Sequence, residues 1–173
     1  MFEKILVPLD GSKLAEIAIP YAIELAGKLS SEITFISVKE SRAADAAGHV
    51  PEEADRYDWP ESAFDIEKYL STLDVQAKDV KKVCIVGHPA ETILDYAAGH
   101  GIALIVMSTH GQSGIMRWAI GSVATKVVTY AKQPVMLIKA NRIQHTGNKT
   151  TIKKIFVPLD GSPESEMVLS PVS

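Results

Sequence analysis

The feature that most constrains the fold of this chain is a regular alternation of short apolar runs with segments of helical periodicity. Runs typical of strands occur at residues 4–10, 32–38, 80–87, 102–108 and 133–139. Apolar residues at helical spacing separate them at residues 14–29, 64–73, 89–101 and 121–131. Strands that are apolar almost throughout and are joined by helices are typical of a parallel sheet covered on both faces. The alternation therefore predicts an α/β fold.

Length and composition limit the remaining possibilities. A chain of 173 residues can build one domain with a substantial core but is marginal for two. No apolar run approaches the roughly 20 residues needed to cross a bilayer, and the first residues lack a signal-type pattern, so we expect a cytoplasmic protein without membrane contact. The formal net charge of −3 argues against a basic nucleic-acid-binding face. Cys84 lies in an apolar run and is expected to be a core residue.

The chain also contains a repeat. The sequence EKILVPLDGS at residues 3–12 returns as KKIFVPLDGS at residues 153–162. Such near-identity indicates that a second copy of the domain begins near the end of the chain. We therefore predict a domain at 1–140, a polar linker at 141–150, and the start of a truncated second copy at 151–173. This copy supplies only a strand and the opening of a helix, so it docks on the first domain, docks on a neighbouring molecule, or stays mobile.

Unusual residues follow two of the predicted strands. The sequence PLDGS ends the first strand, and STHGQSG ends the fourth. In open parallel sheets, ligands bind beyond the carboxyl ends of the strands. Glycines such as Gly111 and Gly121 let a ligand approach backbone N–H groups, and a helix starting at Gly121-Ser122 offers free amides and a positive dipole end. The pattern indicates an anion site, with a long glycine-capped turn as the alternative reading.

Two polar side chains in these segments have competing roles. Asp10 can accept hydrogen bonds from a ribose or a nucleobase, or it can cap the following helix, as Ser12 also can. His110 lies beside the expected anion site, but no carboxylate is near it in sequence, which favours positioning over general-base chemistry. No residues have metal-ligand spacing. We therefore assign no catalytic residue and no metal ligand from the sequence.

Several motifs occur together in one order: KILVPLDGS, AIPYAIELA, ITFISV, GHPAETIL, LIVMSTHGQSG, GSVATKVV and PVMLIK. With these motifs residues 2–140 resemble the universal stress protein family. The resemblance implies a Rossmann-like five-stranded parallel sheet in the order 3-2-1-4-5 with helices on both faces. It also implies the nucleotide-binding pattern G-x-x-G-x9-G-[ST]. In this chain Ser108 takes the place of the first glycine, and Gly111 and Gly121-Ser122 match the rest.

By resemblance, the chain is an ATP-binding module that acts in stress response, with at most slow hydrolysis. Mg²⁺ held by the ATP phosphates would need few protein ligands. The edge strand at 135–139 is expected to form a homodimer, or a pseudo-dimer in a tandem protein. The alternative is a dimerising scaffold without nucleotide, in which Ser108 closes the phosphate pocket. The residues expected to bind ATP are Pro8, Leu9, Asp10, Val38, Met107, Ser108, His110, Gly111, Gly121, Ser122, Val123 and Ala124.

Overall fold

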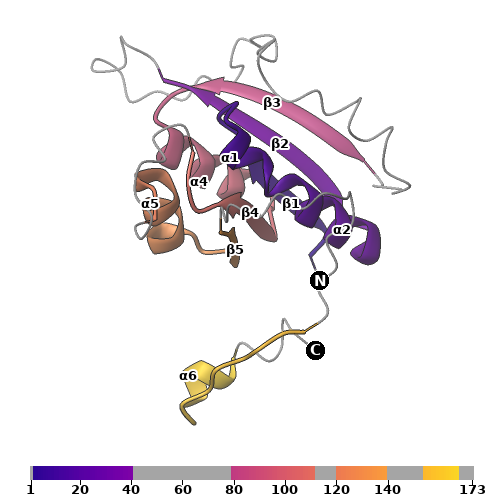
Figure 1. Ribbon diagram of the computed structural model, residues 1–173, viewed down its shortest axis with the longest axis vertical. Coiled ribbons are helices and arrows are strands. Elements are labelled where there is room, and N and C mark those ends of the chain that lie inside the picture. The colour runs from indigo at the N-terminus through magenta and orange to yellow at the C-terminus, as the bar shows by residue number, and fades with distance from the viewer. Residues whose placement is uncertain (1, 41–78, 112–119, 140–153, 168–173) are drawn as a thin grey trace.

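The computed structural model describes residues 2–40, 79–111, 120–139 and 154–167, and its centre is one parallel sheet (Figure 1). The strands are β1 (Lys4–Pro8), β2 (Glu32–Lys39), β3 (Val80–Val86), β4 (Leu104–Ser108) and β5 (Val135–Ile138). Every pair is parallel, and the strand order is β3-β2-β1-β4-β5. The predicted α/β fold and strand order are confirmed. The order also places the carboxyl ends of β1 and β4 side by side.

Helices connect the strands where the sequence predicts them. The described helices are α1 (Lys13–Glu16), α2 (Ile19–Leu29), α4 (Pro89–Gly99), α5 (Ser122–Tyr130) and α6 (Pro163–Glu166). Each of these described helices is too short or too polar to cross a bilayer. The helix predicted at 64–73 lies outside the described residues. The α4 helix starts at a proline and ends at a glycine, which is the asymmetry expected of helix ends.

One predicted helix is divided in two. We expected a single helix over 14–29 with a kink at Pro20, but α1 ends at Glu16 and α2 starts at Ile19. Proline has no N–H and therefore cannot donate to the carbonyl four residues earlier, which is that of Glu16. Its fixed φ suits the first turn of a new helix, where Pro20 now lies. The correction is thus a helix break where a modest kink was expected.

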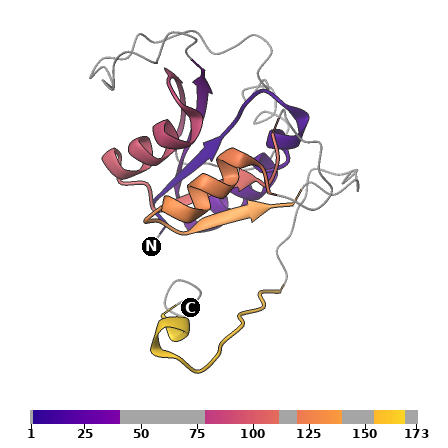
Figure 2. The ribbon, with the colours of Figure 1, turned by 90° about the vertical axis from the view of Figure 1, so that its left-hand side faces the viewer.

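The core lies on both faces of the sheet because successive strand residues point to opposite faces. Ile5 and Val7 contact α1 and α2, whereas Leu6 between them contacts α4 and α5. All three side chains are fully buried. A fully buried side chain of this size contributes about 1.5–3 kcal/mol through removal of apolar surface from water. Figure 2 shows α4 and α5 from the side on which they cover the sheet.

The edges of the sheet differ from its centre. β1 and β4 are buried along nearly their whole length, but β3 exposes Lys81 and Lys82 and is not buried on both faces. Charged side chains on an edge strand discourage pairing with another chain. Cys84 of β3 is buried as expected, and burial raises the pKa of its thiol. The other edge, β5, carries no such charge and is half-buried along Val135–Leu137.

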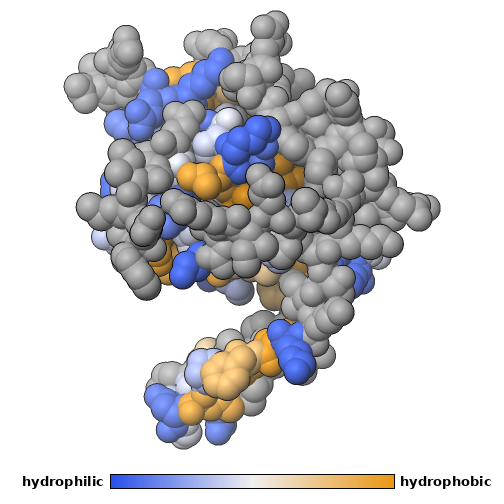
Figure 3. All heavy atoms as spheres, in the orientation of Figure 1, coloured by the Kyte–Doolittle hydropathy of each residue, from blue (hydrophilic) through white to orange (hydrophobic). Residues whose placement is uncertain are grey.

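Residues 154–167 lie apart from the sheet in both ribbon views (Figures 1 and 2). Residues 154–160 form no described ladder, and the short α6 follows them. Their apolar side chains face solvent, with Ile155 66%, Phe156 89% and Met167 73% exposed. The space-filling view shows hydrophobic residues, in orange, on the surface of the separate segment (Figure 3). The division into a first domain, a linker and a second copy stays a prediction.

Candidate functional site

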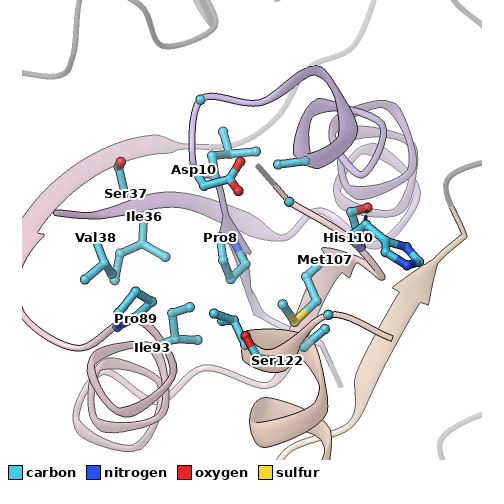
Figure 4. Close-up of a pocket in the computed structure, with 18 of the residues that line it drawn as sticks. Pro8, Asp10, Ile36, Ser37, Val38, Pro89, Ile93, Met107, His110 and Ser122 are labelled. Atoms are coloured by element: carbon cyan, nitrogen blue, oxygen red, sulfur yellow. Dashed lines mark hydrogen bonds between the residues drawn. The ribbon is translucent and has the colours of Figure 1, made fainter. Parts of the chain in front are cut away.

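A cavity of about 830 Å³ lies at the carboxyl ends of the central strands (Figure 4). The ends of β1, β2 and β4 form its base, and the first residues of α4 and α5 close one side. This is the position at which open parallel sheets bind ligands, because the loops diverge where the strand order reverses. Sheet topology alone therefore accounts for the position of the cavity.

Every residue that the sequence predicted as ATP-binding lines this cavity. These residues are Pro8, Leu9, Asp10, Val38, Met107, Ser108, His110, Gly111, Gly121, Ser122, Val123 and Ala124. Sequence reasoning missed the other lining residues, which are Gly11, Ala15, Ile36, Ser37, Lys39, Glu40, Pro89, Ile93 and Thr109. Some of them could have been found from their position at or after the carboxyl end of a strand, since Lys39 ends β2 and Pro89 follows β3. Whether these residues hold a nucleotide stays a prediction.

Asp10 is held by a turn that its own sequence encodes. Its Oδ1 accepts a hydrogen bond from the Ser12 amide at 2.9 Å, and Gly11 between them adopts φ +79°. The cap of α1 is Ser12, whose Oγ accepts from the Ala15 amide at 3.1 Å. Serine therefore takes the capping role for which both residues were candidates. The Asp10 side chain lines the cavity from above in Figure 4.

Gly111 fits closely against the Asp10 carboxylate. A Cβ at position 111 would overlap Asp10 Oδ2, so any other residue would displace the carboxylate or the loop. The absence of a Cβ at Gly111 thus lets the Asp10 side chain keep this position. This contact joins the loops that follow β1 and β4 into one wall of the cavity. That Gly111 also lets a ligand approach the backbone stays a prediction.

Hydrogen bonds fix the loop that follows β4. The Thr109 amide donates to the Ile138 carbonyl at 2.9 Å, and the Gly121 amide donates to the Thr109 carbonyl at 2.8 Å. Ser108 is buried, with 5% of the residue exposed, and its Oγ accepts from the His110 amide at 3.2 Å. A Cβ at Gly121 would lie 3.3 Å from the Thr109 carbonyl oxygen, which leaves little room for a side chain. Thr109 is therefore tied to β5 and to the start of α5.

The start of α5 is electropositive and faces the cavity. Gly121 is its N-cap and provides no side-chain cap. Ser122, Val123 and Ala124 occupy the first turn, where backbone N–H groups have no carbonyl partner within the helix. These amides and the helix dipole together favour a bound anion. The arrangement suits a phosphate group.

The opposite part of the cavity is apolar. Ile36, Val38, Pro89 and Ile93 lie close together in Figure 4, between the end of β2 and the start of α4. Such a surface suits a flat ring that is mostly apolar on its faces. Asp10 lies above these side chains, and Ser122 at the start of α5 lies between Ile93 and Met107 in this view (Figure 4). A ligand with a ring at one end and an anion at the other matches this layout.

His110 is not directed toward the centre of the cavity. Its ring is turned away from the hollow in Figure 4, and its Nδ1 lies 2.9 Å from the Thr109 hydroxyl. Its Nε2 is buried and has no hydrogen-bond partner within the described part of the chain. This orientation favours the positioning role over general-base chemistry. Among the described residues, no group of three His, Cys, Asp or Glu side chains could hold a metal ion.

A family model for universal stress proteins matches residues 1–139. The chain belongs to the universal stress protein family. Universal stress protein MJ0531 of Methanocaldococcus jannaschii is 28% identical over 144 residues, covering 80% of this chain and 83% of that protein. Universal stress protein YxiE of Bacillus subtilis is 28% identical over 148 residues, covering 80% of this chain and the whole of that protein.

Solved universal stress proteins have the same fold. UspA from Lactobacillus plantarum superposes with a TM-score of 0.58 at 27% identity, covering 79% of this chain and 97% of that chain. A universal stress protein in complex with cAMP superposes with a TM-score of 0.54 at 19% identity, covering 81% of this chain and 98% of that chain. At that identity the second likeness shows the fold alone.

This universal stress protein departs from the G-x-x-G-x9-G-[ST] pattern only at its first position. Gly111 lies close to the Asp10 carboxylate, Gly121 lies close to the Thr109 carbonyl, and Ser122 begins α5. Ser108 takes the first position, where its hydroxyl bonds to the loop itself. The Ser108 side chain is thus accommodated within the loop, and the cavity beside it remains open.

Proposed function

We propose that this universal stress protein binds ATP in the cavity and acts in stress response through ligand-dependent conformation or choice of partner. One observation carries the proposal: the electropositive start of α5 and the carboxylate of Asp10 line the same 830 Å³ cavity, beside an apolar surface suited to a base. The family and a structural neighbour in complex with cAMP support an adenine nucleotide as the ligand.

Each part of the cavity suits one part of the nucleotide. The adenine ring would contact the apolar side chains near Ile36 and the backbone of Val38. Pro8, Leu9 and Asp10 would line the ribose, with the Asp10 carboxylate accepting hydrogen bonds from its hydroxyl groups. Met107, Ser108, His110 and Gly111 would border the ribose and phosphates, and the first turn of α5 would hold a phosphate at Gly121, Ser122, Val123 and Ala124.

The proposal includes at most slow hydrolysis. Fast hydrolysis needs a base within hydrogen-bond reach of the attacking water. His110, the one histidine among the described residues that line the cavity, has its ring turned away from the hollow (Figure 4). Mg²⁺ would enter with the ATP phosphates and would need few ligands from the protein.

A direct test measures nucleotide in the purified protein. Heat denaturation should release copurified adenine nucleotide, and added ATP with Mg²⁺ should raise the melting temperature of the protein. Gly121→Val should weaken ATP binding by tenfold or more, on the order of 1.4 kcal/mol, because its side chain crowds the Thr109 carbonyl. Gly99→Val, at the open end of α4, is the matched control and should bind ATP normally. Absence of uptake at millimolar ATP would refute the proposal.

A second candidate function is a dimerising scaffold that binds no nucleotide. Two observations favour it. The Ser108 hydroxyl accepts the hydrogen bond of the His110 amide, and the apolar strand β5 at the edge of the sheet is only half-buried. We infer that residues 135–139 form a homodimer contact, or a pseudo-dimer with a second copy that begins at residue 151. Sedimentation equilibrium tests this: a monomer at all concentrations, with or without ATP, would contradict the dimer.

A further inference from the structure

We propose that Met107 is a modification site: hydrogen peroxide that enters the cavity oxidises its sulfur to the sulfoxide, and the sulfoxide weakens nucleotide binding. The inference rests on the proposed function, because it takes the ligand to be an adenine nucleotide. It adds to that function a chemical regulation of the same cavity, set by the oxidation state of one side chain.

The first observation is the position of the sulfur atom. Met107 lies near the carboxyl end of β4 and lines the cavity together with Ile93 and Ala124. In Figure 4 its sulfur, in yellow, points toward the hollow near Ser122. Met107 is the one sulfur-containing side chain among the described residues that line the cavity. Although only 6% of the residue is exposed, its exposed part therefore borders the cavity, which a small oxidant can enter.

Met107 also belongs to the core between the sheet and the helices α4 and α5. The buried residues that form one cluster with it include Ile36, Ile93, Ala124 and Val127. A thioether is apolar and flexible, so it suits this surface. A sulfoxide is polar and carries an added oxygen, which is costly to bury among aliphatic side chains. The oxygen is therefore directed to the open side, into the space proposed for the ligand.

The start of α5 acts on the sulfoxide in the same direction. The amides of its first turn, at Ser122, Val123 and Ala124, have no carbonyl partner within the helix. Val123 packs against the cluster that contains Met107. The sulfoxide oxygen carries partial negative charge and accepts hydrogen bonds, as a phosphate oxygen does, and the positive end of a helix dipole favours both. The sulfoxide and the phosphate therefore compete for one group of donors.

The modification is an oxygen transfer that balances with peroxide alone. A lone pair of the Met107 sulfur attacks one oxygen of hydrogen peroxide, so that an S–O bond forms and the O–O bond breaks. The departing hydroxide and the proton left on the transferred oxygen form water. The sulfur is oxidised by two electrons and the peroxide is reduced by two. Methionine sulfoxide reductases reverse this modification, which makes it suitable for regulation.

Peptide mass spectrometry after treatment with hydrogen peroxide tests access to the sulfur. Met107 should be oxidised in the ligand-free protein. With ATP at about ten times its Kd, oxidation should be about tenfold slower, because only the free protein reacts. Met167, which is 73% exposed, is the internal control and should react equally fast with and without ATP. Equal rates at Met107 in both conditions, or an unmodified Met107 when Met167 is fully converted, would overturn the inference.

Isothermal titration then compares ATP binding before and after oxidation. Conversion of Met107, followed in the same sample by mass spectrometry, should weaken ATP binding about tenfold in the wild type. Met107→Leu has a side chain of similar volume that peroxide does not oxidise. Whatever the affinity of this variant for ATP, peroxide should change it by less than about twofold. The variant keeps Cys84 and the other methionines, so it controls for their oxidation.

A matched control is Met167→Leu, which removes an exposed methionine far from the cavity in both ribbon views (Figures 1 and 2). Its affinity for ATP should fall on oxidation by the same factor as that of the wild type. Circular dichroism should show that the oxidised proteins stay folded. Unfolding on oxidation would overturn the inference, because the loss of binding would then not arise within the cavity.

The possible failures are distinguishable. Wild-type protein that binds ATP, and binds it equally well after Met107 is converted, overturns the inference and leaves the proposed function intact. So does a Met107→Leu variant that loses affinity with peroxide as the wild type does, because another residue is then responsible. If the reduced wild-type protein takes up no ATP, the proposed function and the inference both fail.

Discussion

Residues 4–12 and residues 154–162 differ only at Leu6 and Phe156, and they form the same turn in different surroundings. The Ser12 and Ser162 amides each donate to the preceding aspartate Oδ1 at 2.9 Å. Gly11 and Gly161 adopt φ of +79° and +82°. In both copies the serine Oγ then accepts from the amide three residues later at 3.1 Å. The sequence Asp-Gly-Ser therefore encodes this turn locally, without help from the sheet.

Burial separates the two copies. Ile5 and Leu6 are fully buried between β2 and β4, but their counterparts Ile155 and Phe156 are 66% and 89% exposed. Asp10 also gains a role that Asp160 lacks in the described structure, since it lines the cavity against Gly111. The difference teaches that neighbouring strands, and not the motif itself, create the core and the site.

The largest expected contrast is in stability. Leu6→Ala should lower the free energy of unfolding by about 2–5 kcal/mol, because it leaves a cavity in a fully buried position. Phe156→Ala should change it by less than about 0.5 kcal/mol, because that ring is exposed. Urea unfolding followed by far-UV circular dichroism measures both. A loss above about 1 kcal/mol in Phe156→Ala would show that the second segment is docked in solution.

The next contrast is in ligand binding. Asp10→Asn should weaken ATP binding about tenfold, because the amide is a weaker acceptor than the carboxylate for the ribose hydroxyls. The variant keeps an Oδ1 that can accept from Ser12, so the turn should persist. Asp160→Asn is the matched control and should bind ATP as the wild type does. Equal effects of the two substitutions would contradict the proposed position of the ligand.

A smaller contrast is expected at the glycines of the two turns. A Cβ meets nothing within 4 Å at Gly11 or Gly161, so alanine introduces only the strain of a positive φ. Gly11→Ala should cost about 1 kcal/mol of global stability, since this turn connects β1 to α1. Gly161→Ala should leave the global unfolding curve unchanged. Thermal unfolding of both variants checks this, and a shifted midpoint in Gly161→Ala would reveal coupling between the two regions.

The smallest effect concerns pH. Hydrogen bonds from the Ser162 side chain and backbone lower the pKa of Asp160 to about 2. Formation of the turn lowers the pKa of Asp160, so ionised Asp160 stabilises the second turn at pH values above the ordinary aspartate pKa. This stabilisation is lost as the pH falls toward 2. A carboxyl NMR titration should show a midpoint near 2 in the wild type and a higher one in Ser162→Ala. Identical midpoints would contradict the hydrogen bonds.

The sequence predicts local features well because their causes are local. The apolar runs locate every strand of the sheet, and the glycines identify the loop that faces the cavity. The division between α1 and α2 was only partly foreseen: Pro20 indicated a kink, but α1 ends at Glu16 and α2 starts at Ile19. The strand order came from the family resemblance, since periodicity alone allows several orders of parallel strands.

The lining residues that were missed come from contacts between distant segments. Ile93 faces the cavity because α4 crosses over the end of β2, and nothing within its own helix indicates this. The capping role of Ser12 also depended on geometry, because Asp10 and Ser12 are equally suitable by residue type. The bond between Ser108 and His110 depends on a side-chain rotamer, which the sequence could not supply.

The backbone of Thr109 contacts two elements of the fold. Its amide bonds to the last residue of β5 and its carbonyl bonds to the N-cap of α5. One residue thus links the start of α5 to β5 at the edge of the sheet. Any displacement of this residue by a bound molecule would reach β5, and association at β5 would act back on the start of α5 with equal free energy. If the protein binds a ligand at α5 and a partner at β5, as proposed, these two hydrogen bonds would couple the two binding events.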